Sequence, residues 1–184
     1  MPVSEEAVRS SVLPAGTWSV DPARSKVVFA IKHMALTTLH GCFHEFEGTI
    51  ELRDGTPSAR GSVRAGSIDT GDQIRDSHLR ESTDFFDVEH HPEITFRSSH
   101  ITASGRRLRV EGELSMRGRS REIVLEGQLG ELPDGAPGER RIELALRGEL
   151  NRKDFGLTWN QALDAGGALL GNKVKLELTL SATG

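Results

Sequence analysis

The sequence predicts an all-β protein that folds as a barrel of about eight antiparallel strands. Apolar and polar residues alternate with a period of two through successive segments, as in strands that have one buried and one solvated face. Turn-forming residue pairs separate many of these segments. An antiparallel meander must close or cover its edge strands, and a barrel does so. A two-sheet sandwich is the alternative architecture that the pattern leaves open.

The predicted elements follow one another along the chain. Residues 1–15 form a flexible polar lead-in, and residues 16–184 form a single domain. The buried faces of the strands are expected to carry Val27, Phe29 and Ile31; Cys42, His44, Phe46, Gly48, Ile50 and Leu52; Ala59, Gly61, Val63 and Ala65; Ile94 and Phe96; Leu108, Val110, Gly112, Leu114 and Met116; Ile123, Leu125, Gly127 and Leu129; Ile142, Leu144, Leu146, Gly148 and Leu150; and Val174, Leu176, Leu178 and Leu180.

Turns and helices complete the predicted pattern. The turn signals between strands are Asp54-Gly55, Ser104-Gly105, Arg117-Gly118 and Pro133-Asp134-Gly135. Helical content should be small. The best candidate is 72–81, followed by a turn at 82–86, and a weaker candidate is 161–165.

Composition and charge exclude several classes of function. The 184 residues are 36% hydrophobic and 27% charged, and the net charge of −4 gives no general attraction to nucleic acid. The single cysteine, Cys42, excludes an internal disulfide framework. No apolar run is long enough for stable membrane insertion, and the N-terminus lacks the apolar segment of a signal peptide. A cytoplasmic location is therefore expected, and pairing of strand edges into a homodimer is left open.

The inward faces of the predicted strands are apolar and interspersed with glycine. A barrel of about eight strands is wide enough either to fill with side chains or to hold one small ligand. Glycine on an inward face leaves room in the lumen and permits close approach. The pattern alone allows both a filled core and an apolar cavity, with the filled core slightly favoured.

The segment 75–96 is long for a connection between strands and carries chemically active residues. His78, His90 and His91 lie among acidic residues, but they lack a recognised zinc-ligand spacing, as do His33, His40 and His44. No metal site is therefore predicted.

Catalytic chemistry is weakly indicated in the same segment. Asp76, Ser77 and His78 are adjacent, whereas a catalytic triad is defined by geometry, and no G-x-S-x-G elbow is present. No catalytic residue is predicted. Phe85 and Phe86 would form either a plug or the mouth of an apolar pocket. Arg75 and Asp76 would be either a structural pair or the polar groups that orient a ligand.

The chain also resembles the YceI-like proteins, which are described as polyisoprenoid-binding and lipocalin-like. The resemblance runs from about residue 16 to residue 181. It rests on the order and spacing of GTWSVDPARSKVVFAIKH, HGCFHEFEG, SIDTGDQIRDSHL, DFFDVEHHPEITFRS, GELSMRGRSREIVL, NRKDFGL and LLGNKVKLELTLSA. It implies an eight-stranded lipocalin-like barrel with one or two short helices around an elongated apolar cavity. With this resemblance, an apolar cavity is favoured over a filled core.

The resemblance implies a non-enzymatic protein that binds a polyisoprenoid, an isoprenoid quinone or a fatty amide as a carrier, store or sensor, with no other cofactor. The alternatives are an enzyme that acts on a lipid in the same pocket, with a carboxylate and His78 as acid and base, and a filled-barrel structural or stress protein. The residues expected to contact the ligand are Phe29, Ile31, Phe46, Ile50, Phe96, Leu114, Met116, Leu125, Leu144, Leu146, Leu176 and Leu178 in the cavity, Phe85 and Phe86 at its mouth, and Arg75, Asp76 and His78 at a polar head group or in support of the lid.

Overall fold

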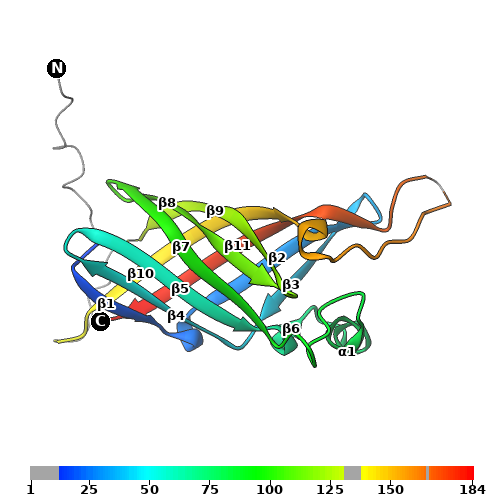
Figure 1. Ribbon diagram of the computed structural model, residues 1–184, viewed down its shortest axis with the longest axis horizontal. Helices are drawn as coiled ribbons and strands as arrows, with labels where there is room; N and C mark the ends of the chain where they lie inside the picture. The colour runs from blue at the N-terminus through cyan, green and yellow to red at the C-terminus, as the bar shows by residue number, and fades with distance from the viewer. Residues whose placement is uncertain (1–12, 131–137, 165) are drawn as a thin grey trace, which may run out of the picture.

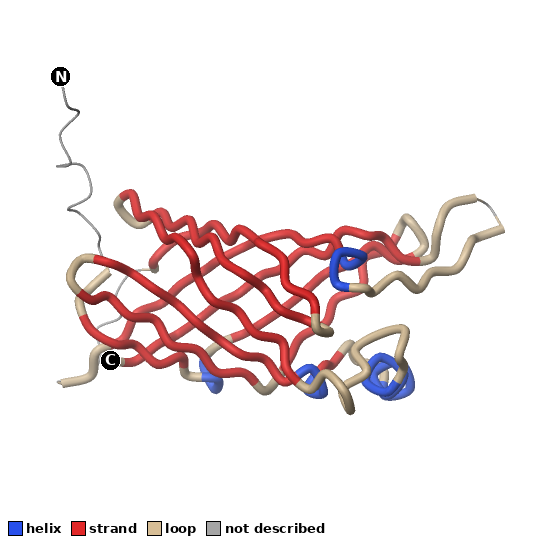
Figure 2. Tube along the Cα trace, viewed as in Figure 1, coloured by secondary structure: helices blue, strands red, loops and turns tan. Residues whose placement is uncertain are grey.

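The computed structural model describes residues 13–130, 138–164 and 166–184, and it shows a closed eight-stranded antiparallel barrel (Figures 1 and 2). The predicted fold class is confirmed. The strand segments are β1 (Gly16–Val20), β2 (Lys26–His33), β3 (Thr37–Phe43), β4 (Phe46–Arg53), β5 (Thr56–Arg64), β6 (Ile68–Asp69), β7 (Glu93–Ser104), β8 (Arg107–Met116), β9 (Arg119–Leu129), β10 (Arg141–Asn151) and β11 (Leu170–Thr183).

Three of the eight barrel strands are each interrupted once. The first consists of β1 and β2, the second of β3 and β4, and the third of β5 and β6. β1 pairs with β4, β2 pairs with β3, and β3 pairs with β6. The remaining neighbours follow the order β5-β7-β8-β9-β10-β11. Pairing of β11 with both β1 and β2 closes the ring, with Ser19 opposite Thr183. Closure leaves the long strands of the barrel paired on both sides, which removes the exposed edges of an open sheet.

The interruption between β3 and β4 changes which residues face inward. His44 and Glu45 lie between the two strands, outside the ladder. Phe43 and Phe46 therefore both border the interior, although they lie three positions apart. The expectation that Cys42 and His44 share the buried face with Phe46 is wrong. Alternation holds only within an uninterrupted strand, and the odd spacing between these two inward residues shows that the interruption shifts its phase.

The turn predictions hold wherever the structure describes them. Asp54 and Gly55 adopt φ values of 52° and 76°, and Arg117 and Gly118 adopt 55° and 70°. Two consecutive positive φ values match a tight hairpin whose twist follows that of its strands. Gly105 has a φ of 58° in the turn between β7 and β8. The predicted turn at 133–135 lies outside the described residues.

The better of the two helix predictions is confirmed within one residue. Helix α1 spans Gln73–Glu81, and the Asp72 carboxylate caps it by accepting from the N–H groups of Ile74 and Arg75, each at 3.0 Å. The weaker prediction is wrong for residues 161–164, and residue 165 lies outside the described part. There the Leu169 N–H donates to the carbonyl of Gln161 at 2.8 Å, and this bond folds the segment back on itself.

Two clusters of buried side chains fill opposite parts of the barrel. The first surrounds Trp18 and includes Leu13, Ile50, Leu52, Leu129, Ile142, Leu144 and Ala182. The second includes Val110, Leu114, Met116, Ile123, Leu125, Leu146, Phe155 and Leu157. Leu13, which falls in the predicted lead-in, is 9% exposed and packs into the first cluster. Residues 1–12 of that lead-in lie outside the described part.

Gly127 in β9 lies close to the backbone of β10, and its replacement should destabilise the barrel. A Cβ at Gly127 would lie 1.8 Å from the carbonyl oxygen of Ala145, a backbone atom that cannot swing aside. We expect Gly127→Ala to lower the free energy of unfolding by about 1–3 kcal/mol, the usual cost of overpacking. Denaturant unfolding measures this loss. The control is Gly66→Ala, because a Cβ there would meet no atom within 4 Å. Equal stability of the two variants would contradict the prediction.

Candidate functional site

The interior of the barrel contains a cavity of about 320 Å³. This volume lies at the lower end of the range of about 300–1,000 Å³ typical of small-molecule sites. Phe29, Phe46, Phe96, Leu176 and Leu178 all border the cavity and are only half-buried, although the barrel wall surrounds them. Since their free surface faces the lumen, the barrel is not a filled core.

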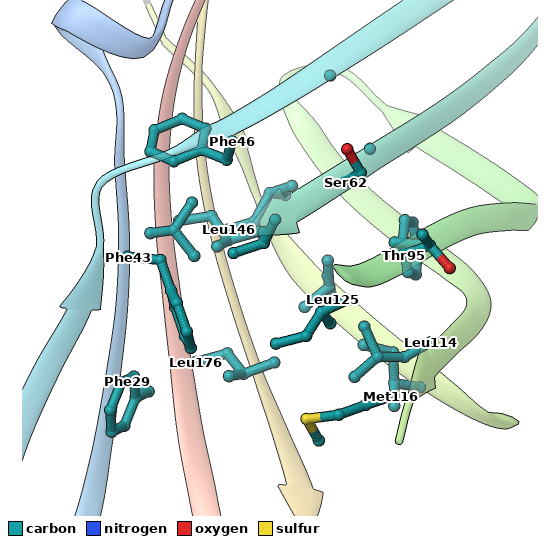
Figure 3. Close-up of a pocket in the computed structure, with 18 of the residues that line it drawn as sticks. Phe29, Phe43, Phe46, Ser62, Thr95, Leu114, Met116, Leu125, Leu146 and Leu176 are labelled. Carbon is teal, nitrogen blue, oxygen red and sulfur yellow. The ribbon is translucent and has the colours of Figure 1, made fainter. Parts of the chain in front are cut away.

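The apolar side chains predicted to contact a ligand all border this cavity. They are Phe29, Ile31, Phe46, Ile50, Phe85, Phe86, Phe96, Leu114, Met116, Leu125, Leu144, Leu146, Leu176 and Leu178. Figure 3 shows labelled members of this set on opposite walls, with Phe29 and Leu176 on one side and Leu114, Met116 and Leu125 on the other. Their contact with a ligand stays a prediction.

Several further lining residues lie outside the set predicted from the sequence. They include Val27, Leu39, Phe43, Val63, Ile68, Leu79, Arg152, Leu157 and Val174. Val27, Val63 and Val174 had been placed on inward faces but not in the site. Phe43 was missed because of the phase change at His44, although two phenylalanines three positions apart, Phe43 and Phe46, were a visible sign of an interruption.

The two ends of the cavity are closed by different structures. The cluster around Trp18 fills one end, where the Trp18 indole donates to the carbonyl of Pro14 at 3.1 Å. At the other end, α1 and the segment after it lie beside the barrel (Figure 1). There Phe85 packs against Trp159 with ring centroids 5.5 Å apart, and Phe86 packs against Phe43 at 5.9 Å. These aromatic pairs place Phe85 and Phe86 at a boundary of the cavity.

Arg75, Asp76 and His78, the predicted polar residues, lie outside the cavity lining. The buried Asp76 carboxylate accepts from the Thr70 N–H at 3.0 Å, and Arg75 donates from Nε to Thr70 Oγ1 at 2.8 Å. Thr70 itself borders the cavity, so the pair lies behind the wall and ties α1 to the residue that follows β6. The His78 ring packs on Phe85 at 5.4 Å. Both predicted roles of these residues, contact with a polar head group and support of the segment after α1, stay predictions.

Polar side chains are few in the cavity wall, and one of them is buried. The polar lining residues are Glu47, Thr49, Arg60, Ser62, Thr70, Thr95 and Arg152. Of these, Arg152 is 3% exposed, whereas the others are half-buried or exposed. Burial lowers the pKa of the Arg152 guanidinium, because desolvation penalises its charged form.

The remaining histidine clusters lie away from the cavity. His90 does not border the cavity. Its Nδ1 lies 2.9 Å from the Asp87 carboxylate, and this contact raises the pKa of His90. On the barrel's outer surface, donor atoms of Cys42, His44 and Asp69 lie within 4.8 Å of one another. His44 Nε2 lies 2.8 Å from the Asp69 carboxylate, and this hydrogen bond lowers the pKa of Asp69. Sequence spacing gave no sign of this group, because Asp69 comes from β6.

Among the described residues, no helix combines the length and apolar character needed to cross a membrane.

Known proteins resemble this chain in both sequence and fold. Residues 18–182 match the YceI-like domain family. UPF0312 protein SA2479 of Staphylococcus aureus strain N315 is 31% identical over 164 residues, which cover 87% of this chain and 93% of the relative.

Solved structures show the same barrel. BcnA of Burkholderia cenocepacia superposes with a TM-score of 0.74 at 23% identity, over 88% of this chain and 98% of that one. A polyisoprenoid binding domain from Saccharophagus degradans, implicated in plant cell wall breakdown, superposes with a TM-score of 0.69 at 16% identity, over 90% and 97% of the two chains.

Proposed function

The chain belongs to the YceI-like family, and we propose that it binds a long lipophilic molecule inside its barrel as a carrier, store or sensor. A polyisoprenoid, an isoprenoid quinone or a fatty amide has the required shape. One structural neighbour is a polyisoprenoid binding domain, which supports the first of these classes. A cytoplasmic location belongs to the same proposal.

The observation that carries the proposal is the half-buried state of apolar side chains that face the lumen, around a cavity of about 320 Å³. Burial of apolar surface contributes about 25 cal/mol for each Å² removed from water. An apolar chain in this lumen would cover its own surface and that of the surrounding side chains. Such a ligand can therefore bind tightly with few hydrogen bonds.

A binding role is supported over catalysis by the chemistry of the wall. Apart from Arg152, its polar members are half-buried or exposed. His78, the acid or base of the enzymatic alternative, packs on Phe85 and does not border the cavity. General acid–base catalysis requires a group within hydrogen-bond reach of the reacting atom. The proposal is accordingly a non-enzymatic protein.

Mass spectrometry of organic extracts from the natively purified protein tests the proposed function. We expect a lipophilic compound at close to one molecule per chain, because the apolar lumen stabilises it through purification. A fluorescent prenyl probe should bind the delipidated protein and be displaced by that compound. Absence of both the lipid and probe binding would contradict a lipid-binding function and favour a structural or stress protein. Turnover of the bound lipid that is lost in His78→Ala would favour the enzyme.

A further inference from the structure

We propose that Arg152 holds an anionic group at the end of the ligand's apolar chain, so that the preferred ligand is a long-chain carboxylate or phosphate. The inference rests on the proposed function and makes it more specific, because it separates anionic lipids from neutral prenols, quinones and esters. The shared chemistry of the two anions is a terminal oxygen that carries negative charge and accepts hydrogen bonds.

Local structure places Arg152 in the wall of the cavity. Residues Arg152–Phe155 form a short 3-10 turn directly after β10, visible as the orange coil in Figure 1. The Asn151 side chain caps this turn by accepting from the Lys153 N–H at 3.0 Å. Arg152 is 3% exposed and belongs to the cavity wall, whereas the next residue, Lys153, is exposed.

The guanidinium group of Arg152 is fixed through two of its three nitrogens. Its Nε donates to the carbonyl of Gly171 at 2.7 Å. Its Nη1 donates to the carbonyls of Leu157 and Trp159 at 2.6 and 2.8 Å. Nη2 is shielded from solvent and has no hydrogen-bond partner among the described residues. An unpaired buried donor is unfavourable, and more so when it is charged, so a ligand oxygen at Nη2 would be favoured.

The charge of Arg152 is also uncompensated. All three of its acceptors are neutral backbone carbonyls. No carboxylate of the described residues forms a salt bridge with it, and burial is the cause that acts on its pKa. A neutral ligand oxygen would only accept a hydrogen bond from Nη2. An anionic oxygen would accept this hydrogen bond and also balance the positive charge of the guanidinium. This difference is the basis for predicting an anionic end.

The position of Arg152 sets the direction of the ligand. Trp159, whose carbonyl binds Arg152, packs its ring on Phe85 at the end of the cavity near α1. The opposite end is filled by the cluster around Trp18. The anionic end would therefore lie near Phe85, and the apolar chain would extend along the half-buried leucines toward Trp18.

Binding of four probes to the delipidated wild-type protein tests the preference. The probes are hexadecanoate, hexadecyl phosphate, hexadecanol and methyl hexadecanoate, which share one apolar chain. We expect at least one of the anions to bind tenfold or more tighter than both neutral probes, and a stronger response to one anion identifies the carboxylate or phosphate class. Equal affinities would overturn the role of Arg152 and leave the proposed function standing. Failure of all four to bind a protein that still binds the prenyl probe would overturn the inference alone, and failure of the prenyl probe as well would overturn both.

Variants assign the preference to this residue. Arg152→Gln should abolish the preference for the anion while it changes hexadecanol affinity by less than about twofold, and Arg152→Lys should restore part of the preference. Arg117→Gln is the matched control, because Arg117 also donates to two backbone carbonyls but does not border the cavity. Retention of the anion preference in Arg152→Gln would contradict the proposal.

Arg152→Gln also removes bonds that hold Gly171, Leu157 and Trp159 in place, so folding of the variant is checked by thermal melting. If the variant does not fold, a crystal structure of the wild-type protein with hexadecanoate decides the question. A carboxylate oxygen within hydrogen-bond distance of Arg152 Nη2 is expected. A carboxylate placed elsewhere would overturn the inference.

Discussion

Trp18→Ala is expected to lower the free energy of unfolding by about 3–5 kcal/mol, the usual cost of truncating a buried tryptophan. The Trp18 side chain is 1% exposed and lies at the centre of the cluster that closes one end of the barrel. Its removal would leave a cavity among Ile50, Leu129 and Ile142, which come from three different strands. It would also remove the stacking of Arg140, whose guanidinium carbon lies 4.7 Å from the ring centroid.

This loss is a large fraction of the 5–15 kcal/mol that stabilises a typical domain. Denaturant unfolding with an unchanged m-value measures it, and the melting temperature should fall by roughly 6–20 °C for a chain of this size. Trp18→Phe is the control, because it keeps an aromatic ring and loses mainly the hydrogen bond to Pro14, worth about 1 kcal/mol. A loss below about 1 kcal/mol in Trp18→Ala would show that this cluster does not hold the barrel closed.

The barrel architecture was predictable because its information is local and repeated. Each strand presents alternate residues to the core, so a period of two recurs wherever the backbone is extended. Turn geometry was equally local, since Asp54-Gly55 and Arg117-Gly118 supply the positive φ values that tight hairpins need. Closure of the ring was inferred only from the need to cover edges. The pairing of Ser19 with Thr183 joins residues at opposite ends of the chain and leaves no local pattern.

The phase of the alternation was harder to predict than its period. A period of two can place either Cys42, His44 and Phe46 or Phe43 on the inward face of this segment. The sequence pattern alone does not choose between these two faces. The choice depends on hydrogen bonds between distant segments, such as that from the His44 N–H to the Ser67 carbonyl at 3.3 Å. Such bonds support an interruption in the strand, and an interruption moves every following side chain to the other face.

The apolar wall of the site could be predicted from the sequence, whereas its buried polar residue could not. Inward leucines and phenylalanines follow from the strand pattern. Arg152 lies in a run of polar and charged residues, Asn151 to Asp154, where an arginine is ordinarily exposed. Its burial depends on three carbonyls that residues 157, 159 and 171 bring around it. No spacing rule links those positions.

Leu176→Trp is expected to weaken binding of the prenyl probe at least a hundredfold, or about 2.7 kcal/mol, while the barrel stays folded. Leu176 lies in β11, is half-buried and points into the cavity between Phe29 and Leu125 (Figure 3). The lumen holds about 320 Å³, so an indole that extends across it leaves no continuous path for an apolar chain. Because Leu176 is not fully packed, the larger side chain can occupy existing space instead of displacing the wall.

Glu177→Trp is the matched control for this prediction. Glu177 is the next residue of β11, its side chain is 60% exposed, and it does not border the cavity. It therefore tests the effect of an added indole on the outer face, where probe affinity should stay within about twofold of the wild type. Fluorescence titration and thermal melting of both variants separate loss of binding from loss of fold. Wild-type affinity in a folded Leu176→Trp variant would place the prenyl probe outside the lumen, because the lumen does not hold both the probe and the indole.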